Sequence, residues 1–239
     1  MSMLQGKVAV ITGASKGIGK AVAKKLAKHG ASIAAAATSK DLLENLAQEL
    51  LDLGVECIAF PCDVGRFKDC EQFVQKTLKR FKKIDILVNS AGVGYSGTIV
   101  ESNPGEVDNM VKVNMLGVYY MIRSVLPSMI KRKNGDIVNI GSVAGIKYSP
   151  NFAMYSATKF GVRALSEALR NEVQRYYIRV TLIHPGMTKT PFFDSFSKGG
   201  SPIPVDKGDI LRPEDIANAI YFSLMRPGGV ALNPHYAVK

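Results

Sequence analysis

A tyrosine and a lysine four residues apart, Tyr155 and Lys159, are the first candidates for chemistry in this sequence. Helical residues at this spacing share one face, so the phenol and the ammonium group would lie side by side. A free tyrosine has a pKa of about 10, too high for a base at neutral pH, and a nearby ammonium group lowers that pKa. The pair could then exchange a proton with a carbonyl or hydroxyl oxygen. An isolated pair of this kind is more often an exposed pair on an ordinary helix, so its meaning depends on the rest of the chain.

A second candidate lies near the amino terminus, where Gly13, Gly17 and Gly19 separate an apolar run from a helical pattern. Glycines at a strand-to-helix junction allow a tight turn and a close approach of phosphate groups to the backbone. The helix N-terminus adds N–H donors and a positive potential. The segment therefore predicts a site for the diphosphate of a dinucleotide, and glycines that merely form a turn are the alternative.

Short apolar runs alternate with amphipathic stretches along the whole chain, and these elements must position the candidates. The pattern predicts strands at residues 8–12, 32–37, 55–60, 84–89, 136–141, 178–183 and 230–238, and helices at residues 17–29, 41–53, 67–81, 106–132, 152–176 and 213–225. Pro127 is expected to kink the helix 106–132 or to begin its final turn. Strands that alternate with long helices imply a parallel sheet covered on both faces. We predict one α/β domain over residues 1–239, a doubly wound Rossmann fold with a seven-stranded, mainly parallel sheet.

Further motifs follow in order along the chain: Asp63-Val64, Asn89-Ser90-Ala91-Gly92, Asn114, Ser142, Tyr155-x3-Lys159 and Pro185-Gly186. Together with the Gly-x3-Gly-x-Gly spacing of residues 13–19, they resemble the short-chain dehydrogenase/reductase family over nearly the whole chain. The family usually has a second asparagine where Ser90 stands, which is a mild departure because serine keeps a polar side chain.

The resemblance implies catalytic roles for four residues. Tyr155 would give or take a proton, and Lys159 would tune it and grip the cofactor ribose. Ser142 would polarise the substrate oxygen from a position just after strand 136–141, where ligands of open α/β sheets bind. Asn114 would hold a water that links Lys159 to solvent.

The resemblance also implies contacts with a nicotinamide dinucleotide. Asp63 would accept a hydrogen bond from the adenine amine beside the backbone N–H of Val64, and Thr188 would meet the nicotinamide carboxamide. The expected cofactor-binding residues are Gly13, Ser15, Lys16, Gly17, Ile18, Gly19, Thr38, Ser39, Lys40, Asp63, Val64, Asn89, Ala91, Gly92, Tyr155, Lys159, Pro185, Gly186 and Thr188.

The residues that follow the second strand favour NADP(H) over NAD(H). An acidic side chain there would bind the ribose 2′-hydroxyl and repel a 2′-phosphate. Residues 36–40 read Ala-Ala-Thr-Ser-Lys, and the first acid is Asp41 at the start of the next helix. Lys16 and Lys40, with the hydroxyls of residues 15, 38 and 39, suit a 2′-phosphate. The family often has arginine where Thr38 stands, so affinity would depend more on Lys16, and use of both cofactors is the alternative.

These features predict an oxidoreductase that moves hydride between the nicotinamide and a carbonyl or secondary alcohol without a metal. Much of the chain resembles 3-oxoacyl-(acyl-carrier-protein) reductases, so a 3-oxoacyl thioester, free or on an acidic acyl carrier protein, is one candidate substrate. Their usual Asp-Gly-Gly ending is missing from the shorter tail after Pro227, which is more like relatives acting on small ketones, hydroxy acids, hydroxy amino acids or pterins. A non-catalytic NADP-binding sensor is the remaining alternative.

Residues 187–212 are expected to form a substrate loop. This segment is irregular, and loops of such length often cover active sites. Pro191, Phe192, Phe193 and Phe196 would either offer apolar surface to the substrate or belong to the core.

Composition excludes several other classes of protein. The 239 residues are 46% hydrophobic and 21% charged, as in ordinary globular chains, and no apolar run reaches the roughly 18 residues of a membrane helix. The odd, sparse count of three cysteines and the lack of a secretory segment predict the cytoplasm. The net charge of +11 comes without a nucleic-acid motif, so neither nucleic acid nor membrane is an expected partner. By family resemblance, helices 106–132 and 152–176 would pair in a homodimer or homotetramer.

Overall fold

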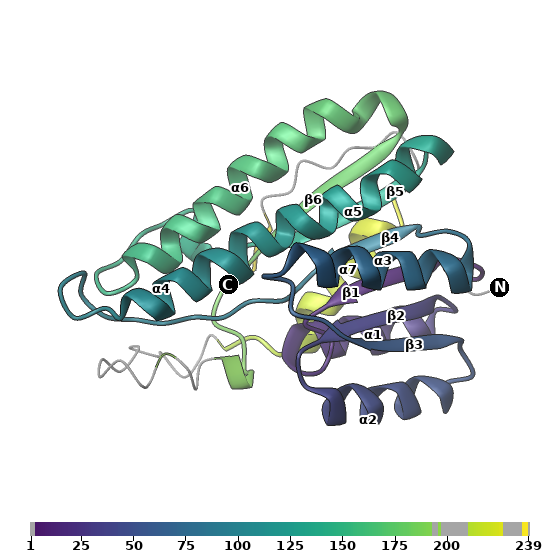
Figure 1. Ribbon diagram of the computed structural model, residues 1–239, viewed down its shortest axis with the longest axis horizontal. Helices are drawn as coiled ribbons and strands as arrows, with labels where there is room; N and C mark the ends of the chain where they lie inside the picture. Colours follow the sequence, from purple (N-terminus) through teal and green to yellow (C-terminus); the bar gives the residue numbers. More distant parts are fainter. Residues whose placement is uncertain (1–2, 193–195, 197–209, 227–235, 239) are drawn as a thin grey trace.

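A parallel sheet of seven strands forms the centre of the protein (Figure 1). The computed structural model describes residues 3–192, 196, 210–226 and 236–238. The strands lie in the order β3-β2-β1-β4-β5-β6-β7, and every neighbouring pair is parallel. Their bounds are β1 Val8–Thr12, β2 Ser32–Ala37, β3 Cys57–Pro61, β4 Ile86–Asn89, β5 Gly135–Ile140, β6 Ile178–Pro185 and β7 Tyr236–Val238. The predicted doubly wound α/β fold is confirmed.

Helices cover both faces of this sheet. Alternate residues of a strand point to opposite faces, so Ala9 and Ile11 of β1 belong to one apolar layer and Val10 to the other. The first layer is completed by α1 (Gly17–Lys28), α2 (Lys40–Leu51) and α7 (Pro213–Leu224), and the second by α3 (Phe67–Phe81), α5 (Gly117–Arg132) and α6 (Ala153–Val173). The near-continuous apolar strands of the sequence are therefore strands buried on both sides.

The strand order reverses between β1 and β4. From β1 the chain first builds β2 and β3 toward one edge and then returns to build β4 to β7 toward the other. Helices that follow β1 and β4 therefore leave the sheet on opposite sides and open a crevice at the carboxyl ends of these two strands.

The segment predicted as one helix over residues 106–132 is three consecutive elements. They are α4 (Pro104–Met110), a π-helical turn (Val111–Leu116) and α5. The side chain of Asn114, within the π turn, makes two 2.8 Å hydrogen bonds with the backbone N–H and C=O of Val93. Turns of this kind are wider than an α-helical turn and recur at functional sites. Pro127 lies inside α5, which continues beyond it to Arg132.

Other differences from the predicted bounds concern strand ends. Strand β6 includes His184 and Pro185, because both pair with β7. Strands β3 and β4 each begin two residues later than predicted, at Cys57 and Ile86. Of the predicted final strand 230–238, only β7 lies within the described residues.

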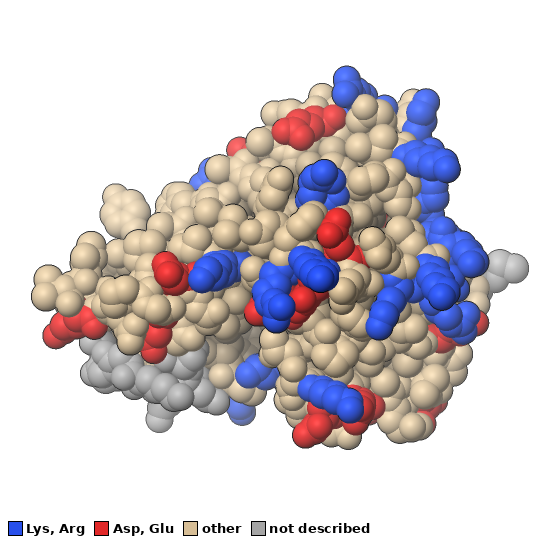
Figure 2. All heavy atoms as spheres, in the orientation of Figure 1, with Lys and Arg blue, Asp and Glu red and all other residues tan. Residues whose placement is uncertain are grey.

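Cations gather at the amino ends of the strands, around the ends of α3 and α5 (Figure 2). Lys79 and Arg80 lie in the last turn of α3, and Lys131 and Arg132 lie in the last turn of α5, where cations complement the helix dipole. The buried carboxylate of Asp85 accepts a 3.0 Å hydrogen bond from Arg132 and a 2.9 Å hydrogen bond from the backbone N–H of Val8. This part of the basic charge therefore stabilises helix ends and strand starts. No helix within the described ranges is long and apolar enough to span a bilayer.

We predict that Asn139→Ala lowers the free energy of unfolding by about 2–3 kcal/mol, because a buried amide loses its partner. Asn139 is fully buried on β5, accepts a 2.8 Å hydrogen bond from Asn89 on β4 and donates one of 2.8 Å to Ser166 on α6. Urea denaturation measures the change. The matched control is Asn171→Ala at an exposed position of α6, where a change within about 0.5 kcal/mol is expected. Equal effects of the two substitutions would contradict the prediction.

Candidate active site

A cavity of about 430 Å³ opens at the crevice between the carboxyl ends of β1 and β4 and extends past β5 and β6. Of the predicted site residues, Gly13, Ser15, Lys16, Gly17, Ile18, Gly19, Thr38, Asp63, Val64, Ala91, Gly92, Ser142, Tyr155, Lys159, Pro185, Gly186 and Thr188 line it. Ser39, Lys40, Asn89 and Asn114 do not. Segments that are far apart in sequence thus meet at one cavity.

The turn between β1 and α1 leaves no room for side chains. Gly13 has a φ of +62°, and a Cβ atom there would lie 2.7 Å from the Cα of Ala91. A Cβ atom on Gly19 would lie 2.3 Å from the carbonyl oxygen of Gly13. The first turn of α1 holds no acidic residue, and its N-cap residue Lys16 makes no side-chain capping bond. The N–H groups and positive potential of this helix end fit the diphosphate of a dinucleotide.

Thr12 holds the opposite wall against this turn. Its buried Oγ1 accepts hydrogen bonds from the backbone N–H groups of Ser90, at 3.1 Å, and Ala91, at 3.2 Å. No role for Thr12 was predicted from the sequence. A hydroxyl residue at the end of an otherwise apolar strand is the feature that could have indicated one.

The three predicted catalytic side chains that line the cavity come from two elements. Ser142 follows β5, while Tyr155 and Lys159 lie one turn apart on α6 and are both buried. The hydroxyl of Tyr155 shares a hydrogen bond with the side chain of Ser142. The Nζ of Lys159 donates a 3.1 Å hydrogen bond to the carbonyl of Ile140 and lies 5.7 Å from the centre of the Tyr155 ring.

Burial controls the protonation of this pair. It raises the pKa of Tyr155 to about 12, against a smaller lowering by the hydrogen bond to Ser142. It lowers the pKa of Lys159 to about 8, because the ammonium form is penalised away from water. The expected lowering of the tyrosine pKa by Lys159 is thus wrong. At neutral pH Tyr155 keeps its proton and can act as an acid.

The fourth predicted catalytic residue, Asn114, is buried behind the cavity wall. Beyond its two bonds to Val93, its Nδ2 donates a 3.3 Å hydrogen bond to Thr158, whose hydroxyl donates one of 2.7 Å to the carbonyl of Tyr155. The asparagine side chain therefore joins the Gly92-Val93 wall to the start of α6.

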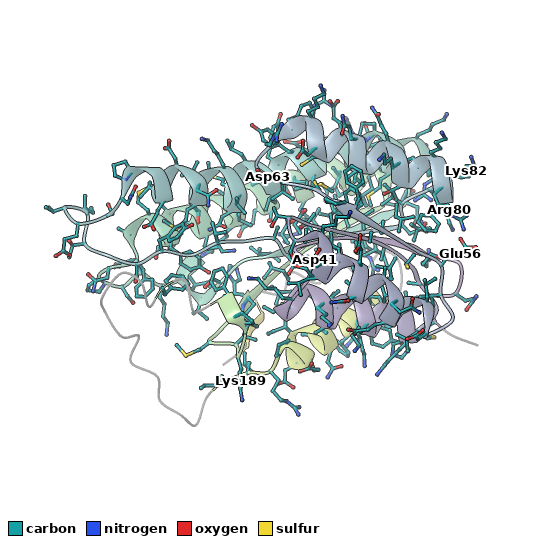
Figure 3. The ribbon with its side chains drawn as sticks, turned by 60° about the horizontal axis from the view of Figure 1, so that its bottom comes forward. Asp41, Glu56, Asp63, Arg80, Lys82 and Lys189 are labelled. Atoms are coloured by element: carbon teal, nitrogen blue, oxygen red, sulfur yellow. The ribbon has the colours of Figure 1, made fainter. Side chains whose placement is uncertain are left out.

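Of the four residues predicted to recognise a 2′-phosphate beside Ser15, two line the cavity and two do not. Lys16 and Thr38 are exposed at the cavity. Lys40 instead points away to Glu44, 3.6 Å away on the next turn of α2, and Ser39 is the N-cap residue of that helix. Asp41 and Asp63 lie near the carboxyl ends of the strands, where the cavity is (Figure 3). Glu56, Arg80 and Lys82 lie at the other end of the sheet. Asn89 supports the sheet through its bond to Asn139.

Two phenylalanines after β6 have different positions: one faces the cavity and the other belongs to the core. Phe192 lines the cavity, with its ring centre 6.1 Å from that of Tyr155. Phe196 is buried against the Tyr155 ring, with centres 5.3 Å apart, and fills the space that a Cβ on Gly94 would need. The predicted substrate loop 187–212 is described at residues 187–192, 196 and 210–212, and Phe193 lies outside the described residues.

Several other residues line the cavity without having been predicted from the sequence. These are Ala37, Cys62, Val93, Asn109, Val113, Ile140, Gly141 and Thr190, while Ser90 belongs to the motif at residues 89–92. They are mostly small or apolar residues, which carry no chemical pattern of their own. The described part of the chain contains no group of three or more histidine, cysteine or acidic residues suited to a metal ion.

Residues 7–200 match the profile of the short chain dehydrogenase family. The chain belongs to this family. An uncharacterized oxidoreductase of Staphylococcus aureus is 34% identical to this short-chain dehydrogenase over 98% of this chain and 97% of its own length. An alcohol dehydrogenase from the archaeon Thermococcus sibiricus, solved with 5-hydroxy-NADP, has a TM-score of 0.84 and 33% identity, over 96% of this chain and 99% of its own. The 3-ketoacyl-(acyl-carrier-protein) reductase of Brucella melitensis, solved with NADH, has a TM-score of 0.86 and 35% identity, over 98% of this chain and 96% of its own.

We predict that the affinity for a nicotinamide dinucleotide, measured with NADPH, weakens as the pH rises through about 8. The lowered pKa of Lys159 means that its ammonium form is present below this pH and is lost above it. An anionic nucleotide binds the ammonium form better, so the dissociation constant should rise by up to about tenfold per pH unit above 8. Titration of NADPH fluorescence from pH 6 to 10 measures it. Lys159→Met should bind more weakly below pH 8 and lack this break, and an unchanged break in the variant would contradict the assignment.

Proposed function

We propose that this short-chain dehydrogenase is an NADP(H)-dependent carbonyl reductase or alcohol dehydrogenase. The observation that carries the proposal is the buried Tyr155 hydroxyl, bonded to Ser142, in the same cavity as the electropositive glycine turn. One end of the cavity suits an anionic nucleotide, and the other offers a proton donor next to a second hydroxyl. This pairing is what reduction of a carbonyl requires.

Lys16 and Thr38 support NADP(H) as the cofactor. Both line the cavity next to the glycine turn and the end of β2, and Ala37, the last residue of β2, is apolar. A cation and a hydroxyl suit a 2′-phosphate, whereas no described acid of β2 is present to bind a free ribose 2′-hydroxyl. The relatives solved with an NADP derivative and with NADH show that both cofactors occur among similar proteins, so use of both is the alternative.

The residues of the cavity divide the chemistry among themselves. Bound NADPH would supply the hydride, and NADP⁺ would accept it in the reverse direction. Ser142 would hold the substrate oxygen, and Tyr155 would donate its proton to that oxygen as negative charge develops there. The raised pKa of Tyr155 keeps this proton in place at neutral pH. The positive charge of Lys159 would then stabilise the phenolate that remains, in a buried setting where charge interactions are strong.

The walls around Tyr155 support an uncharged carbonyl substrate. Val93 and Phe192, which line the cavity, pack in one apolar cluster with Tyr155. The charged side chains among the described lining residues are Lys16, Asp63 and Lys159. Small ketones fit these walls, and so does a 3-oxoacyl thioester, free or carried by an acyl carrier protein. The likeness to an alcohol dehydrogenase and to a 3-ketoacyl reductase supports both candidates. Hydroxy acids and pterins remain alternatives, and a non-catalytic sensor is disfavoured because Tyr155 and Lys159 are both present.

The proposal extends to assembly and location. Helices α5 and α6 lie side by side on one outer face of the protein (Figure 1), where Tyr119 of α5 is exposed. This face would pair with a second copy in a homodimer or homotetramer. The three cysteines are free thiols, which fits the reducing cytoplasm. No nucleic acid or membrane partner is proposed.

The test is consumption of NADPH and NADH by the purified protein over a panel of carbonyl compounds. The panel contains a 3-oxoacyl thioester, a 3-oxo ester, a diketone, an aromatic aldehyde and a 2-oxo acid. We expect turnover of at least one uncharged carbonyl, a preference for NADPH, and a loss of about 100-fold or more in Tyr155→Phe, which lacks the proton donor. Lys16→Ala should raise the KM for NADPH about tenfold and leave that for NADH within twofold.

Tyr155→Phe that still binds NADPH as tightly as the parent protein is the control for folding. Tight NADPH binding without turnover of any carbonyl would contradict the proposed activity and revive the sensor. Equal turnover with NADH, unaffected by Lys16→Ala, would contradict the cofactor assignment alone.

A further inference from the structure

A fully buried histidine, His184, lies behind the cavity wall next to Ser142. It lies near the end of β6, immediately before the cavity-lining residues Pro185 and Gly186. Its Nδ1 lies 2.8 Å from the carbonyl oxygen of Ser142. A carbonyl oxygen can only accept a hydrogen bond, so Nδ1 carries the hydrogen and donates it.

This bond is one of two that hold the backbone carbonyl of Ser142 in place. The same carbonyl accepts a 2.8 Å hydrogen bond from the N–H of Gly145, so both of its lone pairs are used. One residue earlier, the N–H of Gly141 donates a 2.7 Å hydrogen bond to the carbonyl oxygen of Ile183 on β6. Ser142 is thus held where the chain leaves β5, with an extended backbone at φ −170° and ψ 159°.

The imidazole ring of His184 packs closely against the backbone of Gly141. A Cβ atom on Gly141 would lie 2.9 Å from Nδ1 and 3.2 Å from Cε1 of His184. The same atom would lie 3.1 Å from the carbonyl oxygen of Ile183. A side chain at residue 141 would therefore press on the ring first and on the backbone of β6 second. Glycine at this position and histidine at residue 184 form one fitted pair between β5 and β6.

We infer that His184 is a positioning residue for Ser142. By fixing the backbone of Ser142, His184 keeps the serine hydroxyl beside that of Tyr155, where it can hold the substrate oxygen for proton transfer from Tyr155. The Ser142 hydroxyl oxygen also accepts a 3.1 Å hydrogen bond from the N–H of Ala144, so its direction is set by the backbone that His184 fixes. Small displacements of a reacting group cost large factors in rate. The inference rests on the proposed function, because it assigns His184 a role in that reaction.

The experiment is a double-mutant cycle between His184 and Ser142. His184→Leu keeps most of the bulk and removes the donor, while His184→Asn keeps a donor. For the best carbonyl substrate we expect His184→Leu to lower kcat about 10- to 100-fold, with the dissociation constant for NADPH within about threefold of the parent value. His184→Asn should recover most of kcat. In the Ser142→Ala background, His184→Leu should lower kcat by less than about twofold, because the group it positions is gone.

Gly141→Ala provides an independent route if His184→Leu does not fold. It leaves the histidine in the chain and displaces its ring, so it should show the same kcat loss and the same lack of effect in the Ser142→Ala background. Circular dichroism and NADPH binding report on folding for each variant.

Three results would overturn the inference: an unchanged kcat in His184→Leu, the same fold loss with and without Ser142, or a loss of NADPH affinity as large as the loss of kcat. A Ser142→Ala variant with full activity would instead contradict the proposed function. Loss of activity in Ser142→Ala with none in His184→Leu would leave the function intact and remove only the role of His184.

Discussion

The contact between the turn after β1 and the end of β4 is the constraint on which the site depends. Gly13 sits against the Ala91 backbone so closely that a single added carbon would collide with it, and Thr12 holds two backbone N–H groups of the same segment. This contact lies where the strand order reverses, so it sets the width of the crevice between the two halves of the sheet. The N-terminus of α1 then faces the cavity because Gly19 lets it pack on the turn itself.

At the Tyr155 end of the cavity, burial sets the protonation of the two side chains proposed for catalysis. Tyr155 and Lys159 lie on one face of α6, and the aromatic rings of Phe192 and Phe196 cover the tyrosine. Removal from water disfavours both charged forms, which raises the pKa of the phenol and lowers that of the amine. At neutral pH the phenol therefore keeps its proton and the amine is mostly in its ammonium form.

Much of this arrangement could be predicted from the sequence, since it is encoded locally. The alternation of apolar runs and amphipathic stretches predicted the sheet and its layers, and the glycine spacing placed a nucleotide site at the first strand-to-helix junction. Motif positions predicted most of the residues that line the cavity. These features depend on short-range geometry and on burial, which a pattern of residue types records.

What could not be predicted depends on tertiary contacts. The π turn at Asn114 arises from hydrogen bonds to Val93, which is distant in sequence. Burial raises the pKa of Tyr155, and the Phe196 ring from beyond β6 contributes to that burial. Lys40 pairs with Glu44 and does not line the cavity. His184 has no motif, because a lone histidine in an apolar strand reveals nothing of the carbonyl beside it.

Hydrogen exchange with and without NADP⁺, followed by mass spectrometry, tests most directly the central claim that three distant segments form one nucleotide-binding and catalytic cavity. We expect slower exchange on NADP⁺ binding in peptides that cover residues 13–19, 89–93 and 185–190 together. Residues 128–134, at the opposite end of the sheet, should exchange at an unchanged rate. Protection confined to residues 13–19, with residues 89–93 and 185–190 unaffected, would contradict a single cavity.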